Sequence, residues 1–189
     1  MGTDVENRAQ RFRELIEPLL NDGYTFARYL SRDATAAEDI VQEAALRAFR
    51  HLDSLRSTQP RAWLLKIIRT CFYEWREKVV RTATQSLDED TGADDSNGSA
   101  TDTGQAQHDL DPQHILERTM KREAVRAMIE ELPMQFREAL VLRELNELSY
   151  REIADLTGMP IGTVMSRLAR ARDLLRKMWL AHAETGALL

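Results

Sequence analysis

Apolar residues recur along most of this chain at intervals of three and four positions, the period of an α-helix that buries one side. In the first part of the chain the pattern predicts helices over about 5–30, 34–52 and 60–80, the first of them bent near Pro18 or Gly23. Thr35 and Glu38 have the spacing of a capping box at the start of the second helix. In the last part it predicts helices over about 115–131, 134–145, 150–156 and 161–182. Gly and Pro are few and cluster outside these stretches, so the predicted fold class is all-α.

Between the two groups of helices the periodic pattern disappears. Residues 82–113 are rich in Asp, Gly, Ser and Thr and hold almost no large apolar side chains, so they bury too little surface to offset the entropy of ordering. We expect a flexible acidic linker here, with a folded acidic loop as the alternative. The expected domains are therefore an N-terminal helical unit over 5–81 and a C-terminal helical unit over 114–183.

Charge is distributed along the chain in blocks. The formal net charge is −5, which by itself argues against DNA binding. However, the predicted linker carries eight acidic residues and no Lys or Arg, whereas residues 47–81 hold nine basic residues against three acidic ones, and residues 161–180 hold five against one. Attraction to phosphate depends on local charge, so the two basic segments are candidate nucleic-acid-binding surfaces.

Several classes of function are disfavoured by what the sequence lacks. No run of eighteen apolar residues predicts a membrane span, and the polar N-terminus lacks the apolar core of a signal peptide, so we expect a cytoplasmic protein. The single cysteine, Cys71, and the four histidines have no metal-ligand spacing. Neither a nucleophile–base pair nor a Gly-rich phosphate loop can be identified. We therefore expect no metal, no cofactor, no small-molecule substrate and no enzymatic activity. We expect Cys71 to be a buried residue that packs in the core rather than a redox switch.

Residues 149–182 have the pattern of a helix-turn-helix. Ser149 and Glu152 form a capping box, and Gly158 suits the left-handed residue that ends a helix. The second helix of this motif is expected to bury Val164, Leu168, Ala171 and Leu175. A basic outward face on such a helix is typical of insertion into the major groove, and an ordinary hairpin with a solvated face is the alternative. The outward residues, with two at the flanks, are Met165, Ser166, Arg167, Ala169, Arg170 and Asp173.

The helix over about 34–52 has a second candidate surface. Ile40, Ala44 and Ala48 share the side expected to pack inside. On the other side an apolar residue is ringed by polar ones, which suits docking onto another protein, although a solvated face is the alternative. That outward side consists of Asp39, Gln42, Glu43, Leu46 and Arg50.

Basic and aromatic side chains are interleaved along the helix over about 60–80. This combination suits single-stranded DNA, whose phosphates are attracted by charge and whose bases stack on rings. Trp63 is expected to belong to the core instead. The candidate binding residues are Arg61, Lys66, Arg69, Tyr73 and Arg76.

The amino-acid sequences of these segments resemble those of one protein family. Residues 37–43, 61–69 and 132–172 are similar to the extracytoplasmic-function (ECF, group IV) sigma factors of the sigma-70 family. The resemblance implies that Asp39, Gln42 and Glu43 grip the beta-prime coiled coil of core RNA polymerase. It implies that residues 53–59 hold a flipped base of the downstream (−10) promoter element, beside Thr70, which stands where the family usually has Asn. It also implies that the upstream (−35) element is read by positions matching Met165, Ser166, Ala169 and Arg170.

A sigma factor that binds core RNA polymerase, directs it to promoters and helps open the DNA is therefore the function that the resemblance implies. Its partners would be core RNA polymerase, promoter DNA and an anti-sigma factor that restrains it until a stress response begins. The acidic linker would thread the RNA exit path of the polymerase. A conventional helix-turn-helix regulator acting without polymerase is the alternative, and it leaves the outward face of the 34–52 helix without a role.

Overall fold

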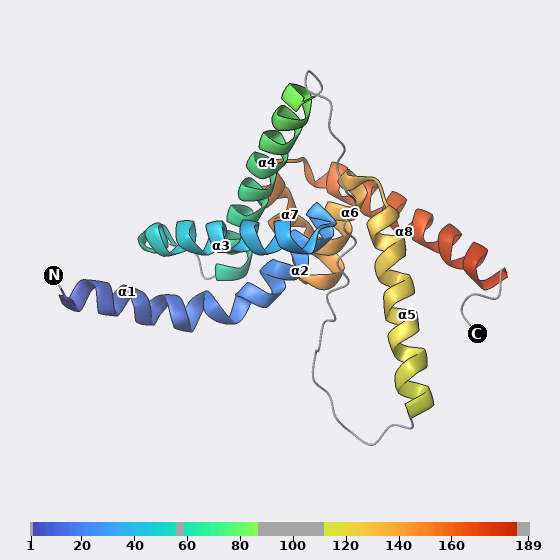
Figure 1. The fold of residues 1–189 in the computed structure, drawn as a ribbon, viewed down its shortest axis with the longest axis horizontal. Coiled ribbons are helices and arrows are strands. Elements are labelled where there is room, and N and C mark those ends of the chain that lie inside the picture. The colour runs from blue at the N-terminus through green and yellow to red at the C-terminus, as the bar shows by residue number, and fades with distance from the viewer. Residues whose placement is uncertain (1, 56–58, 87–111, 185–189) are drawn as a thin grey trace.

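The structure is a computed structural model that describes residues 2–55, 59–86 and 112–184. Every regular element of these residues is helical, which confirms the all-α prediction (Figure 1). None of the described helices combines the length and the apolar character that crossing a membrane requires. The α-helices are α1 (Gly2–Leu15), α2 (Leu20–Ser31), α3 (Ala34–Arg50), α4 (Pro60–Ser86), α5 (Pro112–Glu131), α6 (Met134–Leu140), α7 (Tyr150–Thr157) and α8 (Ile161–Glu184).

The first predicted helix is two helices with a break at Pro18. A short 3-10 turn, Glu17–Leu19, separates α1 from α2, because proline lacks the N–H that a continuous helix would need there. Gly23, the other predicted bend, lies inside α2 and is buried. A Cβ at that position would lie 2.5 Å from Cδ1 of Ile68, so glycine allows α2 to approach α4 closely.

The predicted capping box at Thr35 is wrong, because the N-cap of α3 is Asp33, two residues earlier. Asp33 has an extended backbone and its Oδ1 accepts a hydrogen bond from the backbone N–H of Ala36 at 2.7 Å. Just before it, Arg32 takes a left-handed conformation with φ of 63° and ends α2. Asp33 therefore satisfies one of the free N–H groups in the first turn of α3, which leaves no N-cap role for Thr35.

Other boundaries also differ from the prediction. α3 ends at Arg50 and is followed by a 3-10 turn, Leu52–Ser54. α4 continues to Ser86 and α5 begins at Pro112, so both ends of the predicted linker over 82–113 are helical. Residues 87–111, which include all eight of its acidic residues, lie outside the described residues. The predicted helix over 134–145 consists of α6 and a π-helical segment, Val141–Leu145.

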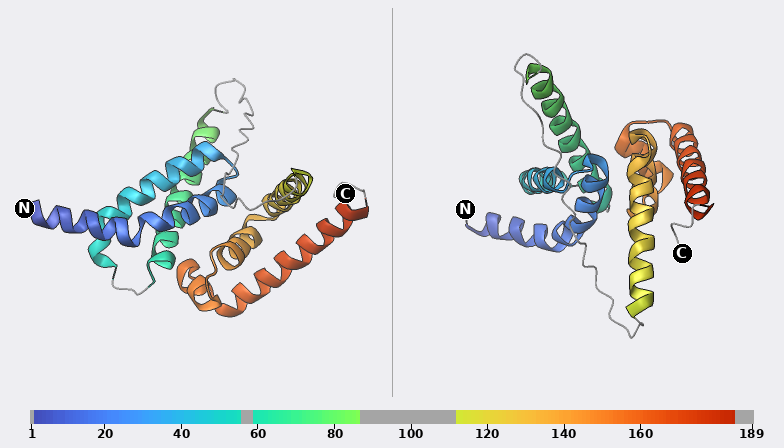
Figure 2. Two further views of the ribbon diagram at one scale, coloured as in Figure 1. Left: turned by 90° about the horizontal axis from the view of Figure 1, so that it is seen from below. Right: turned by 45° about the vertical axis from the view of Figure 1, so that its right-hand side comes forward.

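The two helical units pack against each other. α2 and α4 of the N-terminal unit contact α6, α7 and the π-helical segment of the C-terminal unit (Figures 1 and 2). Buried side chains of both units, such as Phe26 and Ile68 in one and Leu142 and Ile153 in the other, form one continuous cluster. The sequence predicted the two units but not this contact.

Candidate nucleic-acid and polymerase interface

The first part of the helix-turn-helix has the predicted local geometry. Ser149 Oγ accepts a hydrogen bond from the backbone N–H of Glu152 at 3.2 Å, and the backbone N–H of Ser149 donates to Glu152 Oε2 at 2.7 Å. At the other end of α7, Gly158 has φ of 72° and donates its N–H to the carbonyl of Ala154 at 2.8 Å. These two caps confirm the turn and set the direction in which α8 leaves it.

α8 presents the predicted residues to solvent. Val164, Leu168 and Ala171 are buried, and Leu175 is partly buried against the same cluster. On the opposite side Met165 is 53% exposed, and Ser166, Ala169 and Arg170 are exposed as well, whereas Arg167 is half-buried at the flank. We call these outward residues the −35 face: Met165, Ser166, Arg167, Ala169 and Arg170.

Two basic residues farther along α8, Arg172 and Lys177, differ from Arg170 in being paired. Arg172 donates to Glu144 Oε1 at 2.6 Å, and this hydrogen bond raises the pKa of Arg172. Lys177 lies 2.9 Å from Asp173 Oδ2. Within the described residues Arg170 has no ion-pair partner, so its guanidinium is available to a base edge or a phosphate.

α3 separates a buried side from a polar side, as predicted. Ile40, Ala44 and Ala48 are buried, and Leu46 on the other side is 54% exposed. We call the outward side of α3 the polymerase face. It consists of Asp39, Gln42, Leu46 and Arg50, which are exposed, and Glu43, which is half-buried.

Arg47 explains why Glu43 is partly covered, and the sequence analysis missed it. Its Nε donates to Glu43 Oε1 at 2.6 Å, and its two terminal nitrogens donate to the carboxylate of Glu74 on α4 at 2.9 and 2.7 Å. The bidentate contact with Arg47 lowers the pKa of Glu74. The hydrogen bonds to Glu74 and Glu43 together raise the pKa of Arg47. Arg47 therefore ties the polymerase face to α4. The spacing of Glu43 and Arg47, four residues apart on one helix, was the available signal.

An open pocket of about 230 Å³ lies between α3 and α4, next to the predicted base-holding loop. Trp63 lines it and also packs against the buried cluster, so the expected core role of Trp63 holds only in part. Residues 56–58 of the loop lie outside the described residues. The pocket is lined by Arg47, His51, Ser54, Trp63, Ile67 and Thr70.

The candidate residues on α4, which we call the −10 set, are only partly open to solvent. They are Arg61, Lys66, Arg69, Thr70, Tyr73 and Arg76. Lys66, Thr70 and Arg76 are exposed, whereas Arg61, Arg69 and Tyr73 are half-buried. Arg69 Nε donates to Glu138 Oε1 at 2.8 Å, and the Tyr73 hydroxyl lies 3.4 Å from the same oxygen. Arg61 donates to the carbonyl of Asn146 at 3.2 Å, and Arg76 contacts the sulfur of Met134.

Glu138 forms the centre of this contact between the units. Its side chain is 2% exposed, and the ring of Tyr73 lies 4.6 Å from the guanidinium of Arg69 and 5.0 Å from that of Arg76. Burial and the nearby charge of Glu138 raise the pKa of Tyr73. The sequence placed no function on Glu138, although it is one of two charged residues inside the otherwise apolar run 136–142.

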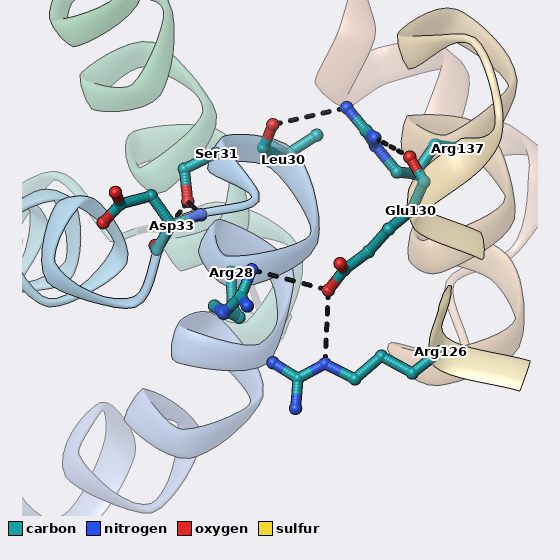
Figure 3. Close-up of polar contacts among 7 residues, drawn as sticks. All are labelled: Arg28, Leu30, Ser31, Asp33, Arg126, Glu130 and Arg137. Carbon is teal, nitrogen blue, oxygen red and sulfur yellow. Dashed lines mark hydrogen bonds and ion pairs between the residues drawn. The ribbon is translucent and has the colours of Figure 1, made fainter. Parts of the chain in front are cut away.

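Arg137, the other charged residue of that run, forms a second contact (Figure 3). Its Nη1 donates to the carbonyl of Glu130 at 2.6 Å and its Nη2 to that of Leu30 at 3.4 Å, at the C-terminal ends of α5 and α2. Helix C-termini attract cations, but burial lowers the pKa of Arg137 to about 10. Glu130 also lies 3.4 Å from Arg28 and 3.2 Å from Arg126.

Cys71 lies on the buried side of α4. It is 4% exposed, and burial raises the pKa of its thiol. A buried thiol with a raised pKa is a poor nucleophile, which agrees with the interpretation of Cys71 as a residue that packs in the core.

Comparisons with known proteins match both halves of the chain. The family model described as "Sigma-70 region 2" matches residues 15–82, and the one described as "Sigma-70, region 4" matches residues 122–175. The chain is 30% identical over 166 residues to the ECF RNA polymerase sigma factor SigM of Bacillus subtilis, covering 88% of this chain and 93% of SigM. It is 34% identical over 145 residues to the ECF RNA polymerase sigma-E factor of Escherichia coli, covering 72% and 70%.

A solved structure is similar over nearly the same span. The sigma factor RpoE from Bartonella quintana, solved in complex with the anti-sigma factor NepR, superposes with a TM-score of 0.70 at 27% identity. The match covers 90% of this chain and 97% of RpoE.

Proposed function

The chain belongs to the ECF RNA polymerase sigma factors, which direct transcription initiation at promoters, and we propose that it does so through three surfaces. The polymerase face of α3 binds core RNA polymerase, the −35 face of α8 reads the upstream promoter element, and the −10 set with its neighbouring pocket binds the opened downstream element. The observation that carries this assignment is that matched regions 2 and 4 each present an exposed, chemically suitable helix face.

Binding to core polymerase uses the apolar centre and polar rim of α3. Leu46 is exposed although its helix buries the opposite side, and acidic, amide and basic groups surround it. This arrangement suits a helix of the beta-prime coiled coil, because burial of Leu46 supplies affinity while Asp39 and Gln42 supply orientation. The test is the dissociation constant for purified core polymerase, measured by fluorescence anisotropy. Asp39→Ala and Gln42→Ala should weaken binding, whereas Glu123→Ala on α5, an exposed carboxylate far along the chain, should not.

Reading of the −35 element uses α8. Arg170 offers a two-pronged donor that suits O6 and N7 of guanine, and Met165 and Ala169 offer apolar contact to a thymine methyl. Ser166 donates its hydroxyl to the carbonyl of Thr163 at 3.0 Å, so it faces DNA chiefly as an acceptor. Selection of active promoters from a pool randomised at the upstream element, using the complete holoenzyme, would give the preferred bases. Loss of preference at one position in Arg170→Ala would assign that contact.

Binding of the opened downstream element uses the pocket between α3 and α4. A flipped base is held by hydrogen bonds to its edge and by stacking on an aromatic ring. His51, Ser54 and Thr70 provide polar groups, and Trp63 provides the ring. A variant with Ser54→Ala and His51→Ala should retain core binding and lose open-complex formation, measured by permanganate reactivity of unpaired thymines. Unchanged reactivity would remove the base-holding role from this pocket.

The remaining partners follow from the family. Because the similar RpoE of Bartonella quintana was solved with the anti-sigma factor NepR, we propose that an anti-sigma factor also restrains this chain. We propose that it acts in the cytoplasm as an initiation factor without catalytic activity of its own. The conventional helix-turn-helix regulator is not favoured, because it accounts for the match at 122–175 and leaves the match at 15–82 without a function.

A further inference from the structure

The 3-10 turn that follows α3 directs neighbouring side chains to different parts of the molecule. His51 and Ser54 line the pocket between α3 and α4, and Leu52 is fully buried in the core. Asp53 keeps 60% of its side chain exposed and lies against α1 instead. The backbone N–H and the Oγ of Ser54 both donate to the carbonyl of His51, at 2.8 and 2.7 Å. Asp53 and the two pocket residues therefore belong to one tightly closed turn.

α1 supplies two cations to the carboxylate of Asp53. Arg8 Nη2 lies 2.5 Å from Asp53 Oδ2, and Arg11 Nη1 lies 3.4 Å from Oδ1, so each guanidinium takes one oxygen. The two arginines are three residues apart and therefore lie on the same side of α1. The residue after Arg11, Phe12, packs edge-on against Phe49 of α3 with ring centroids 5.6 Å apart. This aromatic contact holds α1 beside α3 and presents both arginines to the turn (Figure 1).

The ion pairs with Asp53 are exposed, so their consequence is geometric rather than energetic. Exposed pairs typically contribute little to the free energy of unfolding. A carboxylate that is bound on both oxygens, however, cannot rotate without losing a partner. Among the described residues of the turn, Asp53 has the only side chain that forms an ion pair with another element. Recognition of a ligand requires such supporting contacts, because they fix the side chains that line the site.

We propose that Arg8 and Arg11 are positioning residues for the base pocket. Through Asp53 they fix the turn, and the turn sets the place from which His51 and Ser54 meet a flipped base. The nature of the pocket rests on the proposed function, whereas the anchoring of the turn rests on the contacts with α1 alone. The sequence analysis assigned no role to either arginine.

A direct contact between the two arginines and DNA phosphates is the alternative, and charge separates the two explanations. Removing the carboxylate of Asp53 leaves both arginines in place and raises the local positive charge, so attraction to phosphate would stay equal or increase. Positioning predicts the opposite, because the turn loses its anchor and the pocket loses a fixed wall. Asp53→Asn is therefore the variant for which the two explanations predict opposite results.

The first test measures the anchoring of the turn without DNA. The backbone N–H groups of Ser54 and Leu55 close the turn, and their exchange with solvent is followed by NMR in the complete chain. Exchange should become about two- to fivefold faster in Asp53→Asn, because the loss of an exposed ion pair favours opening to a modest extent. The Arg8→Gln/Arg11→Gln double variant should show the same increase. The two variants change the net charge in opposite directions, so a shared increase is not an effect of charge.

The control for this test is Arg13→Gln. Arg13 lies on the same helix, is exposed and forms no ion pair within the described residues, so its replacement should leave the exchange rates unchanged. Exchange rates in Asp53→Asn and in the double variant that equal those of the control would overturn the proposal.

The second test measures base discrimination by the complete holoenzyme. Rates of open-complex formation are compared on promoters that differ only in the base held by the pocket. Loss of one well-placed hydrogen bond to the base edge should reduce the ratio between the best and the next base about 3- to 10-fold, equally in Asp53→Asn and in the double variant. Affinity for core polymerase and thermal unfolding should stay as in the unmutated chain, because the turn lies outside the polymerase face and its ion pairs are exposed.

Two results of the second test would overturn the positioning role. A uniform loss of open complexes on all promoters in the double variant, with no loss in Asp53→Asn, would show that the arginines bind phosphate. Altered discrimination in Asp53→Asn alone would show that Asp53 contacts the base itself.

The function of the pocket is tested separately by the variant with Ser54→Ala and His51→Ala. If that variant opens promoters normally while the turn variants still exchange faster, the pocket function fails and the anchoring of the turn by α1 stands. If that variant loses opening while the turn variants exchange and discriminate as Arg13→Gln does, the pocket function stands and the positioning role is overturned.

Discussion

The exposed leucine of α3 allows the polymerase contact to be tested with a predicted magnitude. Leu46 keeps 54% of its surface in water in the free chain. Full burial of a leucine side chain is worth about 1.5–3 kcal/mol, so covering the exposed part on docking should contribute about 1–1.5 kcal/mol. Leu46→Ala should therefore weaken binding to core polymerase about 5- to 15-fold. Alanine is the better helix former, so the substitution should not destabilise α3.

The assay is competition anisotropy against a labelled copy of the chain bound to core polymerase. Val125→Ala on α5, which removes an apolar side chain that is 39% exposed, is the matched control and should bind as the unmutated chain does. Thermal unfolding of both variants should match that of the unmutated chain. An unchanged dissociation constant for Leu46→Ala would refute the assignment of this face, and equal losses in both variants would show a general effect of lost apolar surface.

Three further outcomes follow from single residues. Arg170→Ala should reduce discrimination at one base pair of the upstream element by about 1–3 kcal/mol, measured as promoter competition by the holoenzyme, and a uniform loss across all sequences would make Arg170 a phosphate contact instead. Gly158→Ala should lower the free energy of unfolding by about 1 kcal/mol, because φ there is 72° although no atom lies within 4 Å of the added methyl group; denaturant titration that showed no loss would contradict the strain. The lowered pKa of Glu74 stabilises the fold above its ordinary value of 4.5, and this contribution is lost as the pH falls through the folded pKa. The stability difference between the unmutated chain and Glu74→Gln, at most about 1 kcal/mol for a pair this exposed, should therefore shrink on acidification, and a difference independent of pH would mean that the Arg47 pair contributes nothing.

Local features of the fold could be predicted from the sequence because their causes are local. The capping box at Ser149 and the turn at Gly158 depend on a few neighbouring residues, and both are present as expected. The buried stripe of α8 follows from periodicity alone. Where two residues could each cap the same helix, the prediction was wrong. Asp33 caps α3 in preference to Thr35, because the backbone turns at Arg32.

The contact between the units could not be predicted, because it depends on residues far apart in the sequence. Arg69 and Glu138 are 69 positions apart, and each taken singly resembles an ordinary charged residue on a helix. Burial of Glu138 becomes apparent only when α4 is placed beside the C-terminal unit. For the same reason, the residues of the −10 set could be predicted from their basic and aromatic character. Their contacts with the C-terminal unit could not be predicted.

If this chain confers promoter recognition on core RNA polymerase, run-off transcription on genomic fragments will show it. With purified core polymerase lacking any other specificity subunit, the chain should produce transcripts that start at defined positions, and the chain alone should give no sequence-specific shift of the same fragments. Absence of defined starts with core polymerase present, or specific binding to duplex DNA without it, would show that the chain is not a sigma factor.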